Sequence, residues 1–176
     1  MLFRSLLDEQ WAAAAPVTLA AAQASTLPCA ALTAWFALVE EGHLHAGQTV
    51  LIHGTGGVTL FGLQFARLHG AQVIMVSGSE DKRARALALG AHHALARDSD
   101  WPAEVMRLTD GRGAEQVLET VGGANLGRSL QALARNGRVS VIGVIDAGPM
   151  SGSAFDAIGR RATIRSEEHT SELQSH

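Results

Sequence analysis

The chain has 176 residues, of which 47% are hydrophobic, 18% charged and 5% aromatic, and its formal net charge is −3. This length fits one globular domain of about 100–200 residues, and the apolar share can fill a core, which excludes wholesale disorder. Tyrosine is absent, so every mechanism that needs a catalytic tyrosine is excluded. The 14 basic residues are scattered along the chain, which argues against a nucleic-acid partner.

The cysteine content and the apolar stretches narrow the class further. Cys29 is the single cysteine, which excludes an internal disulfide framework and a Cys-rich zinc module. The longest apolar stretches are interrupted by Pro16 and by polar residues, and we expect them to fall short of the roughly 18–20 residues of a membrane span. Asp8 and Glu9 stand where a secretory signal is apolar. We therefore expect a cytoplasmic α/β protein without a membrane partner.

The two ends of the chain differ in composition from the rest. Residues 165–176 are polar and resemble the in-frame translation of a sequencing adapter, and residues 2–5 resemble the other adapter arm. We therefore expect residues 1–5 and 165–176 to be adapter-derived, and the remainder to be a fragment of a longer gene. The alternative for residues 165–176 is a natural acidic tail.

Strands and helices alternate in the predicted structure, after an Ala-rich, mainly helical stretch at residues 16–41 in which Trp35 and Phe36 are aromatic anchors. Short β-branched or apolar runs predict strands at residues 49–53, 72–76, 93–96, 116–121 and 139–144, with a sixth beginning at residues 159–164. Amphipathic runs with capping residues or terminal glycines predict helices at residues 58–69, 80–89, 100–108 and 126–134.

Strands separated by helical crossovers predict a doubly wound parallel sheet with helices on both faces. Its ligand crevice is expected at the carboxyl ends of the strands, where the strand order reverses. The sixth strand meets the acidic tail at residue 165, and that tail cannot supply an apolar face. We therefore expect the sheet to be truncated at its sixth strand, and the strand at 139–144 to expose unpaired backbone groups. Trp35 and Phe36 are expected to be partly uncovered.

The segment Gly54-Thr55-Gly56-Gly57-Val58-Thr59 follows the first predicted strand and opens the first predicted crossover helix. A G-x-G-x-x-G turn in this context is typical of dinucleotide binding: its glycines admit a pyrophosphate, and free N–H groups at the helix start face the phosphates. Thr59 replaces the third glycine, which puts close packing of the helix in doubt. The alternative is a purely structural turn. No Gly-Lys-Ser/Thr follows, which disfavours a kinase-type phosphate loop.

The end of the second predicted strand favours NADP over NAD. NAD sites usually place Asp or Glu there to accept from the ribose 2′-hydroxyl, whereas this chain has Ser77, followed by Ser79, Lys82 and Arg83. Without the acid, hydroxyls and a nearby cation can bind a 2′-phosphate. The missing acid also counts against a methyltransferase. The alternative is a solvated helix N-terminus with ordinary surface charges.

Several runs occur together in one order, at residues 27–35, 47–58, 86–91, 110–114, 119–122 and 137–143. In this order they resemble the medium-chain dehydrogenase/reductase superfamily, which includes zinc alcohol dehydrogenases and zinc-free quinone reductases. The resemblance covers nearly all of residues 6–164. It implies a Rossmann cofactor domain at residues 47–164, preceded at residues 6–46 by the end of a catalytic domain and connecting helices.

The resemblance also implies the activity, which is hydride transfer between NAD(P) and a carbonyl, an alcohol or a quinone. The full-length protein is expected to bind a small-molecule substrate and to form a homodimer. The chain as given is expected to be inactive, because the substrate cleft in this family is built largely by the other domain. The alternative function is a non-catalytic nucleotide-binding or sensor module of the same fold.

Site residues follow from the same resemblance. Thr33 is expected to pack on the nicotinamide, the glycines to bind the pyrophosphate, and Ser77 and Lys82 to lie at the adenosine ribose. The predicted cofactor-binding residues are Thr33, Gly54, Thr55, Gly56, Gly57, Val58, Ser77, Ser79, Lys82, Thr120, Ile142 and Gly143. No residue is predicted to be catalytic.

Metal binding is not expected in this chain. Cys29 lies four residues before Thr33, in the register of one zinc ligand of the zinc alcohol dehydrogenases, but the run around it is more similar to zinc-free members. We expect a small buried cysteine and far less than one zinc per molecule. His43 and His45 are expected to be solvated, and His53 to pack at the end of its strand.

Overall fold

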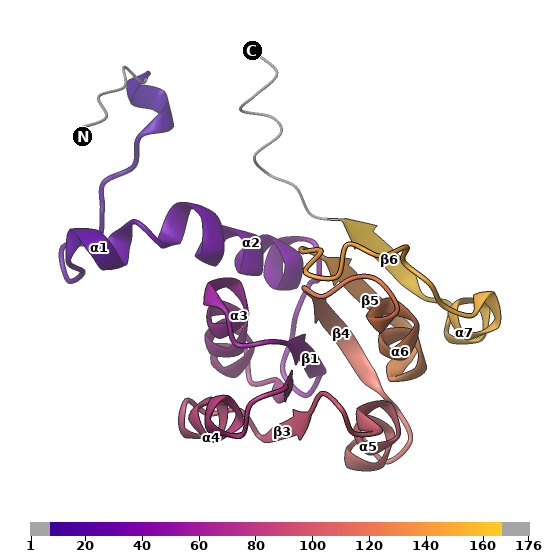
Figure 1. Ribbon diagram of the computed structural model, residues 1–176. Helices are drawn as coiled ribbons and strands as arrows, with labels where there is room; N and C mark the ends of the chain where they lie inside the picture. Colours follow the sequence, from indigo (N-terminus) through magenta and orange to yellow (C-terminus); the bar gives the residue numbers. More distant parts are fainter. Residues whose placement is uncertain (1–7, 167–176) are drawn as a thin grey trace.

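The computed structural model describes residues 8–166, in which a six-stranded parallel sheet is flanked by helices (Figure 1). The strands are β1 (Thr49–His53), β2 (Gln72–Ser77), β3 (His93–Ala96), β4 (Ala114–Glu119), β5 (Leu133–Val141) and β6 (Thr163–Ser166). Their order is β3-β2-β1-β4-β5-β6, so the direction of winding reverses between β1 and β4. The predicted doubly wound sheet is confirmed.

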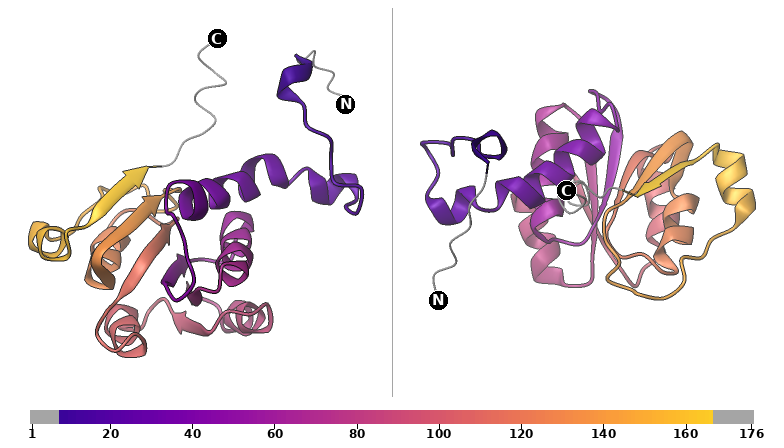
Figure 2. Two further views of the ribbon diagram at one scale, coloured as in Figure 1. Left: turned by 180° about the vertical axis from the view of Figure 1, so that it is seen from behind. Right: turned by 90° about the horizontal axis from the view of Figure 1, so that it is seen from above.

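Helices cover both faces of the sheet. They are α1 (Ala21–Ala24), α2 (Leu32–Trp35), α3 (Gly57–Leu68), α4 (Glu80–Ala88), α5 (Trp101–Leu108), α6 (Asn125–Gln131) and α7 (Ala154–Arg160). The view from above in Figure 2 shows α3 and α4 on one face and α5 and α6 on the other. Single helical turns at Leu27–Ala31 and Phe36–Glu40 flank α2, and a 3₁₀ turn lies at Glu9–Trp11.

Each face of the sheet has its own apolar core. Successive residues of a strand point to opposite faces, so β1 sends Ile52 into the core under α3 and Leu51 into the core under α5 and α6. Leu63 of α3 fills the first core, while Trp101 of α5 and Leu130 of α6 fill the second. The central strand is therefore buried on both sides, which explains its continuous apolar run.

The predicted elements and the structure differ most at β5. This strand begins at Leu133 rather than at residue 139, and α6 ends at Gln131 rather than at residue 134. Inside β5, Asn136 has a left-handed backbone with φ of 61°, and the pairing with β4 shifts register between Ala114 and Gln116. The Asn136-Gly137 pair lies in residues 134–137, which have no partner in β4 between Leu133 (opposite Ala114) and Arg138 (opposite Gln116).

The sixth strand is formed, which corrects the expectation of a truncated sheet and an unpaired β5. β6 pairs with β5 in parallel, from Arg138 opposite Thr163 to Val141 opposite Ser166. Residues 165 and 166, predicted to be tail, continue the strand because backbone pairing does not need apolar side chains; all four side chains of β6 are exposed. The other predicted adapter-derived residues, 1–5 and 167–176, lie outside the described residues.

The helical segment Ala21–Glu40 corrects a second expectation, that no stretch approaches the length of a membrane span. It has 20 residues and a mean hydropathy of 1.3, which suffice by length and composition. A core helix of a globular protein meets the same criteria; here Ala34 and Leu38 are fully buried, although most of the segment is not. Phe36 is exposed and Trp35 is half-buried, so these aromatics are partly uncovered, as expected.

Candidate functional site

The carboxyl ends of β1, β2, β3 and β4 meet at one edge of the sheet, where a cleft of about 360 Å³ opens. The cleft is lined by His53, Gly54, Thr55, Gly56, Gly57, Val58, Thr59, Ser77, Lys82, Arg97, Thr120 and Ile145. This is the edge at which doubly wound sheets bind ligands, beside the switch in strand order. The glycine turn and the predicted residues Ser77, Lys82 and Thr120 are thus brought together.

The glycine turn leaves the start of α3 open. Gly54 has a left-handed backbone with φ of 84°, which only glycine adopts readily. Gly56 caps α3 with an extended backbone, and a Cβ atom there would meet no protein atom within 4 Å. The fold's packing does not need glycine at this position, so the missing side chain gives room for a ligand. The first N–H groups of a helix have no acceptor within the helix, and they favour an anion.

Thr59, the departure from the glycine pattern, does not loosen α3. Its side chain is buried, and Oγ1 donates a hydrogen bond of 2.8 Å to the carbonyl oxygen of Gly56. The close approach of the helix to the sheet occurs at Gly62 instead, where a Cβ atom would lie 2.5 Å from Cδ1 of Leu118. The close packing of α3 against the sheet, which the sequence left in doubt, therefore depends on Gly62 and not on a third glycine in the motif.

The turn after β2 uses its polar side chains in different ways. Ser77 is buried and lines the cleft, as does Lys82. Ser79 caps α4, with Oγ accepting from the N–H of Lys82 at 3.5 Å. Arg83 donates to the carbonyl oxygen of Ser77 at 3.1 Å, so it holds the turn together and lies outside the lining.

Arg97 is a functional candidate that the sequence analysis missed. It follows β3 directly, and its guanidinium carbon lies 3.5 Å from the position of a Cβ atom on Gly78. The backbone N–H of Arg97 donates a hydrogen bond to the carbonyl oxygen of Ser77 at 3.2 Å, which connects Arg97 to the turn after β2. The residues that line the cleft thus include two cationic side chains, Lys82 and Arg97, and no carboxylate. The sequence signal that could have identified Arg97 is a basic residue directly after the third predicted strand.

Four predicted residues lie outside the lining of the cleft. Thr33 donates its hydroxyl to a main-chain oxygen one turn earlier in its own helical segment, at 2.8 Å, and Ser79 caps α4. Ile142 packs against the core under α3. Gly143 lies directly behind Thr120, because a Cβ atom there would come within 2.9 Å of the Thr120 carbonyl oxygen.

Beneath the cleft, His53 packs at the end of β1 as expected, and its ring meets polar partners. Its Nε2 lies 3.0 Å from Oγ of Ser129 and 3.7 Å from Oε2 of Glu119, and all three residues are buried. Burial lowers the pKa of His53; the charge of Glu119 raises it in part, and Arg128 and Arg97 lower it further. The ring is therefore neutral at pH 7.

The described residues do not fit a zinc ion. Cys29 is exposed, which corrects the expectation of a buried cysteine. Within residues 8–166, no three His, Cys, Asp or Glu side chains come close enough together to hold a metal. His43 and His45 are exposed, as expected.

A larger cavity, of about 450 Å³, lies between the N-terminal segment and α3. Trp35 and Phe65 line it together with alanine, leucine and proline side chains, and no ionisable group takes part. Its chemistry offers no reactive or charged group, so the candidate site is the smaller cleft at the strand ends.

Comparisons with known proteins agree with this fold and cleft. Residues 57–167 match the family described as "Zinc-binding dehydrogenase". A zinc-type alcohol dehydrogenase-like protein of Schizosaccharomyces pombe is 37% identical over 159 residues, which are 86% of this chain and 46% of the relative.

Solved structures of dehydrogenases are similar to this chain as well. A protein of Sinorhizobium meliloti 1021 designated an alcohol dehydrogenase is 51% identical, with a TM-score of 0.88 over 96% of this chain and 50% of that chain. A structure named as an NAD-dependent alcohol dehydrogenase is 33% identical, with a TM-score of 0.83 over 92% of this chain and 48% of that chain. The chain spans about half the length of these relatives. It belongs to the zinc-binding dehydrogenase family of the medium-chain dehydrogenase/reductase superfamily, a group of oxidoreductases.

Proposed function

We propose that the cleft binds a nicotinamide dinucleotide and that this chain is the cofactor-binding part of an NAD(P)-dependent oxidoreductase. The observation that carries the proposal is the open start of α3 at Gly56, in one cleft with Lys82 and Arg97. The N–H groups of α3 are suited to the pyrophosphate, and the two cations to a further phosphate. The dinucleotide supplies the hydride, while the protein binds and orients it.

The cations favour NADP(H) over NAD(H). Ser77 stands where an acid would accept from a ribose 2′-hydroxyl, and no lining residue is a carboxylate that would repel a 2′-phosphate. Lys82 and Arg97 approach the same region from α4 and from the end of β3. We expect NADPH to bind about tenfold more tightly than NADH, since a hydrogen bond to a charged group supports a difference of that size.

In the full-length protein, the hydride passes between the nicotinamide and a carbonyl, an alcohol or a quinone. This chain spans about half the length of its relatives, and the described residues place no acid–base group against the cleft other than Lys82 and His53, whose ring is buried. Hydride transfer needs a substrate held against the nicotinamide. We therefore expect the chain by itself to bind the cofactor without oxidising NADPH in the presence of quinones or aldehydes.

The test is a titration of the 176-residue chain with NADPH and with NADH, followed by nicotinamide fluorescence. Lys82→Gln and Arg97→Gln should each weaken NADPH binding by about tenfold and change NADH binding little. Arg135→Gln is the matched control, because Arg135 is exposed near the start of β5 and lies outside the cleft lining. Equal affinities for the two cofactors would refute the preference for NADP(H). Absence of binding by either would refute the cofactor site.

A further inference from the structure

We propose that Glu119, Ser129 and His53 form a buried positioning unit that holds the turn at residues 120–122 against the glycine turn. The consequence for cofactor affinity rests on the proposed function, whereas the positioning itself does not. The three side chains come from β4, α6 and β1, and none is more than 1% exposed.

Glu119 holds the turn directly. Its Oε1 accepts hydrogen bonds from the N–H groups of Val121 at 2.8 Å and of Gly122 at 3.2 Å. Its Oε2 accepts from Nδ2 of Asn125 at 2.8 Å and from Oγ of Ser129 at 2.7 Å. A carboxylate offers about four acceptor positions. Four donors therefore fix this side chain, and the side chain in turn fixes the backbone that follows Thr120.

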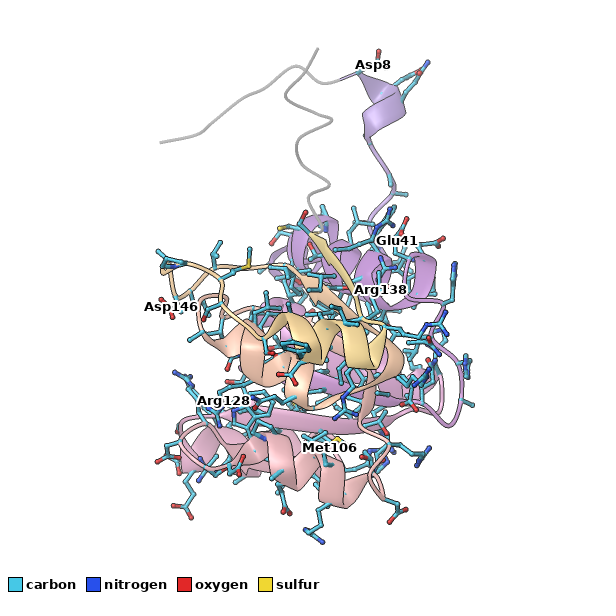
Figure 3. The ribbon with its side chains drawn as sticks, turned by 90° about the vertical axis from the view of Figure 1, so that its right-hand side faces the viewer. Asp8, Glu41, Met106, Arg128, Arg138 and Asp146 are labelled. Carbon is cyan, nitrogen blue, oxygen red and sulfur yellow. The ribbon has the colours of Figure 1, made fainter. Side chains whose placement is uncertain are left out.

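Ser129 connects this carboxylate to His53. The hydroxyl has one hydrogen, which goes to Glu119, so at its contact with His53 the serine oxygen accepts from Nε2–H at 3.0 Å. The ring of Trp101 packs edge-on against the imidazole, with 4.9 Å between the ring centroids, and Cζ of Arg128 (labelled in Figure 3) lies 4.7 Å from the centre of the Trp101 ring. The His53 ring therefore has a defined tautomer and orientation.

These three residue types also occur in nucleophilic triads, but the order here is different. In a triad the histidine lies between the serine and the acid and takes the serine proton. Here the serine lies between the histidine and the acid, and its hydroxyl is fully buried. No substrate reaches the hydroxyl, so the unit positions the backbone and does not react.

The unit acts on both walls of the cleft through the backbone of His53. The carbonyl oxygen of His53 accepts from Oγ1 of Thr120 at 2.8 Å, and the next residue along the chain is Gly54. Beyond the turn, the carbonyl oxygen of Val121 accepts from the N–H of Asp146 at 2.7 Å (Asp146 is labelled in Figure 3). The turn is thus held from below by Glu119 and from outside by the loop after β5.

Loss of the Ser129 hydroxyl tests the unit. In Ser129→Ala, the Nε2–H of His53 loses its acceptor and Glu119 loses one donor, so both side chains gain freedom. We expect the amides of Val121 and Gly122 to exchange with solvent deuterium about tenfold faster, and NADPH affinity to fall about tenfold, as for one buried hydrogen bond to a charged group. Ser129→Thr keeps the hydroxyl and should restore both values.

Thr109→Val is the matched control. Thr109 is also buried, and its hydroxyl donates to the carbonyl oxygen of Val105 at 2.8 Å and accepts from the N–H of Gly113 at 2.9 Å. It follows α5, before β4 begins, at the opposite end of the sheet from the cleft. We expect this variant to lose stability while the amides at 121 and 122 and the NADPH affinity stay unchanged.

A measurement on the unaltered chain keeps the test independent of variant folding. Nitrogen chemical shifts of the His53 ring should show the Nε2–H tautomer, and the Nδ1–H tautomer would overturn the proposal. Unchanged exchange at Val121 and Gly122 in Ser129→Ala would also overturn it, whether or not a cofactor binds. Faster exchange with unchanged NADPH affinity would remove the link to the cofactor site. Failure of the unaltered chain to bind any nicotinamide dinucleotide would instead refute the proposed function.

Discussion

The two faces of the sheet are filled by different kinds of interaction. Under α3, the core is a cluster of apolar side chains such as Ile52 and Leu63. Under α5 and α6, the apolar core around Trp101 adjoins the buried unit of Glu119, Ser129 and His53. Apolar burial stabilises in proportion to area and has no direction, whereas hydrogen bonds act along defined directions. We therefore expect the first face to determine stability and the second to determine stability and the shape of the cleft.

The largest effect should come from Trp101→Ala, on the polar face. Trp101 is fully buried, and its loss is expected to lower the free energy of unfolding by about 3–5 kcal/mol. Because its ring also supports His53, NADPH affinity should fall as well. Leu63→Ala on the other face should cost about 2–5 kcal/mol and leave NADPH affinity unchanged. Urea unfolding and fluorescence titration measure both quantities, and a loss of affinity in Leu63→Ala would break the comparison.

Gly62→Ala should disturb the apolar face by overpacking. The added Cβ atom would lie 2.5 Å from Cδ1 of Leu118, so α3 or Leu118 must move, at a cost of about 1–3 kcal/mol. In α7, Gly159 meets no atom within 4 Å of an added Cβ atom, and Gly159→Ala should stabilise by about 0.5–1 kcal/mol. Thermal unfolding compares the two variants. A Gly62→Ala chain as stable as the parent would show that the contact between α3 and β4 can accommodate an added methyl group without cost.

The pH dependence of the free energy of unfolding should reflect the protonation of His53 on the polar face of the sheet. Because the pKa of His53 is lowered in the folded chain, the unfolded chain binds more protons below its ordinary value of 6.5. The free energy of unfolding should therefore fall as pH drops from about 7 to 5, by up to roughly 1.4 kcal/mol per pH unit for this group. His53→Gln should have a shallower slope, although His92 keeps part of it because burial and Arg67 lower its pKa too. An unchanged slope in His53→Gln would contradict this assignment.

The smallest effect on stability is expected at the outer edge, beyond the α5/α6 face. Phe155 and Ile158 of α7 are 87% and 72% exposed, and Ile164 of β6 is exposed as well. Exposed apolar patches promote association. Phe155→Ser should change the free energy of unfolding by less than about 0.5 kcal/mol and reduce concentration-dependent association in light scattering. Leu68→Ser, at an 81% exposed position on α3, is the control and should leave association unchanged.

What the sequence predicted well depended on local signals. The bounds of β1 were predicted to the residue, because an apolar β-branched run ends at a glycine that takes a left-handed backbone. The start of β5 was missed, because the strand begins at Leu133 through its pairing with Ala114 of β4, ahead of a shift in register. Tertiary contacts, which no local pattern reveals, decided that strand.

The candidate site shows the same division. The glycine turn could be located from the sequence because its strand, glycines and helix are consecutive. Arg97 could not, since its place beside Lys82 depends on the meeting of strand ends that are distant along the chain. Thr33 and Ser79 stay predictions, since they lie outside the cleft lining and their side chains make hydrogen bonds within their own helical segments. Spacing alone does not show which hydroxyl is already engaged.

Glu41 joins the beginning of the fold to its end and so bears on the order of folding. Its carboxylate contacts Arg138 of β5 at 3.3 Å and also contacts Arg165 of β6. Glu41 and Arg138 are labelled in Figure 3. These contacts span 97 and 124 residues, and closing such long loops costs entropy before any contact is gained. We therefore expect these ion pairs to form after the sheet is assembled. Glu41→Gln should therefore accelerate unfolding and leave the refolding rate unchanged. The Glu41 carboxylate would then slow the unfolding of the assembled chain without taking part in its folding.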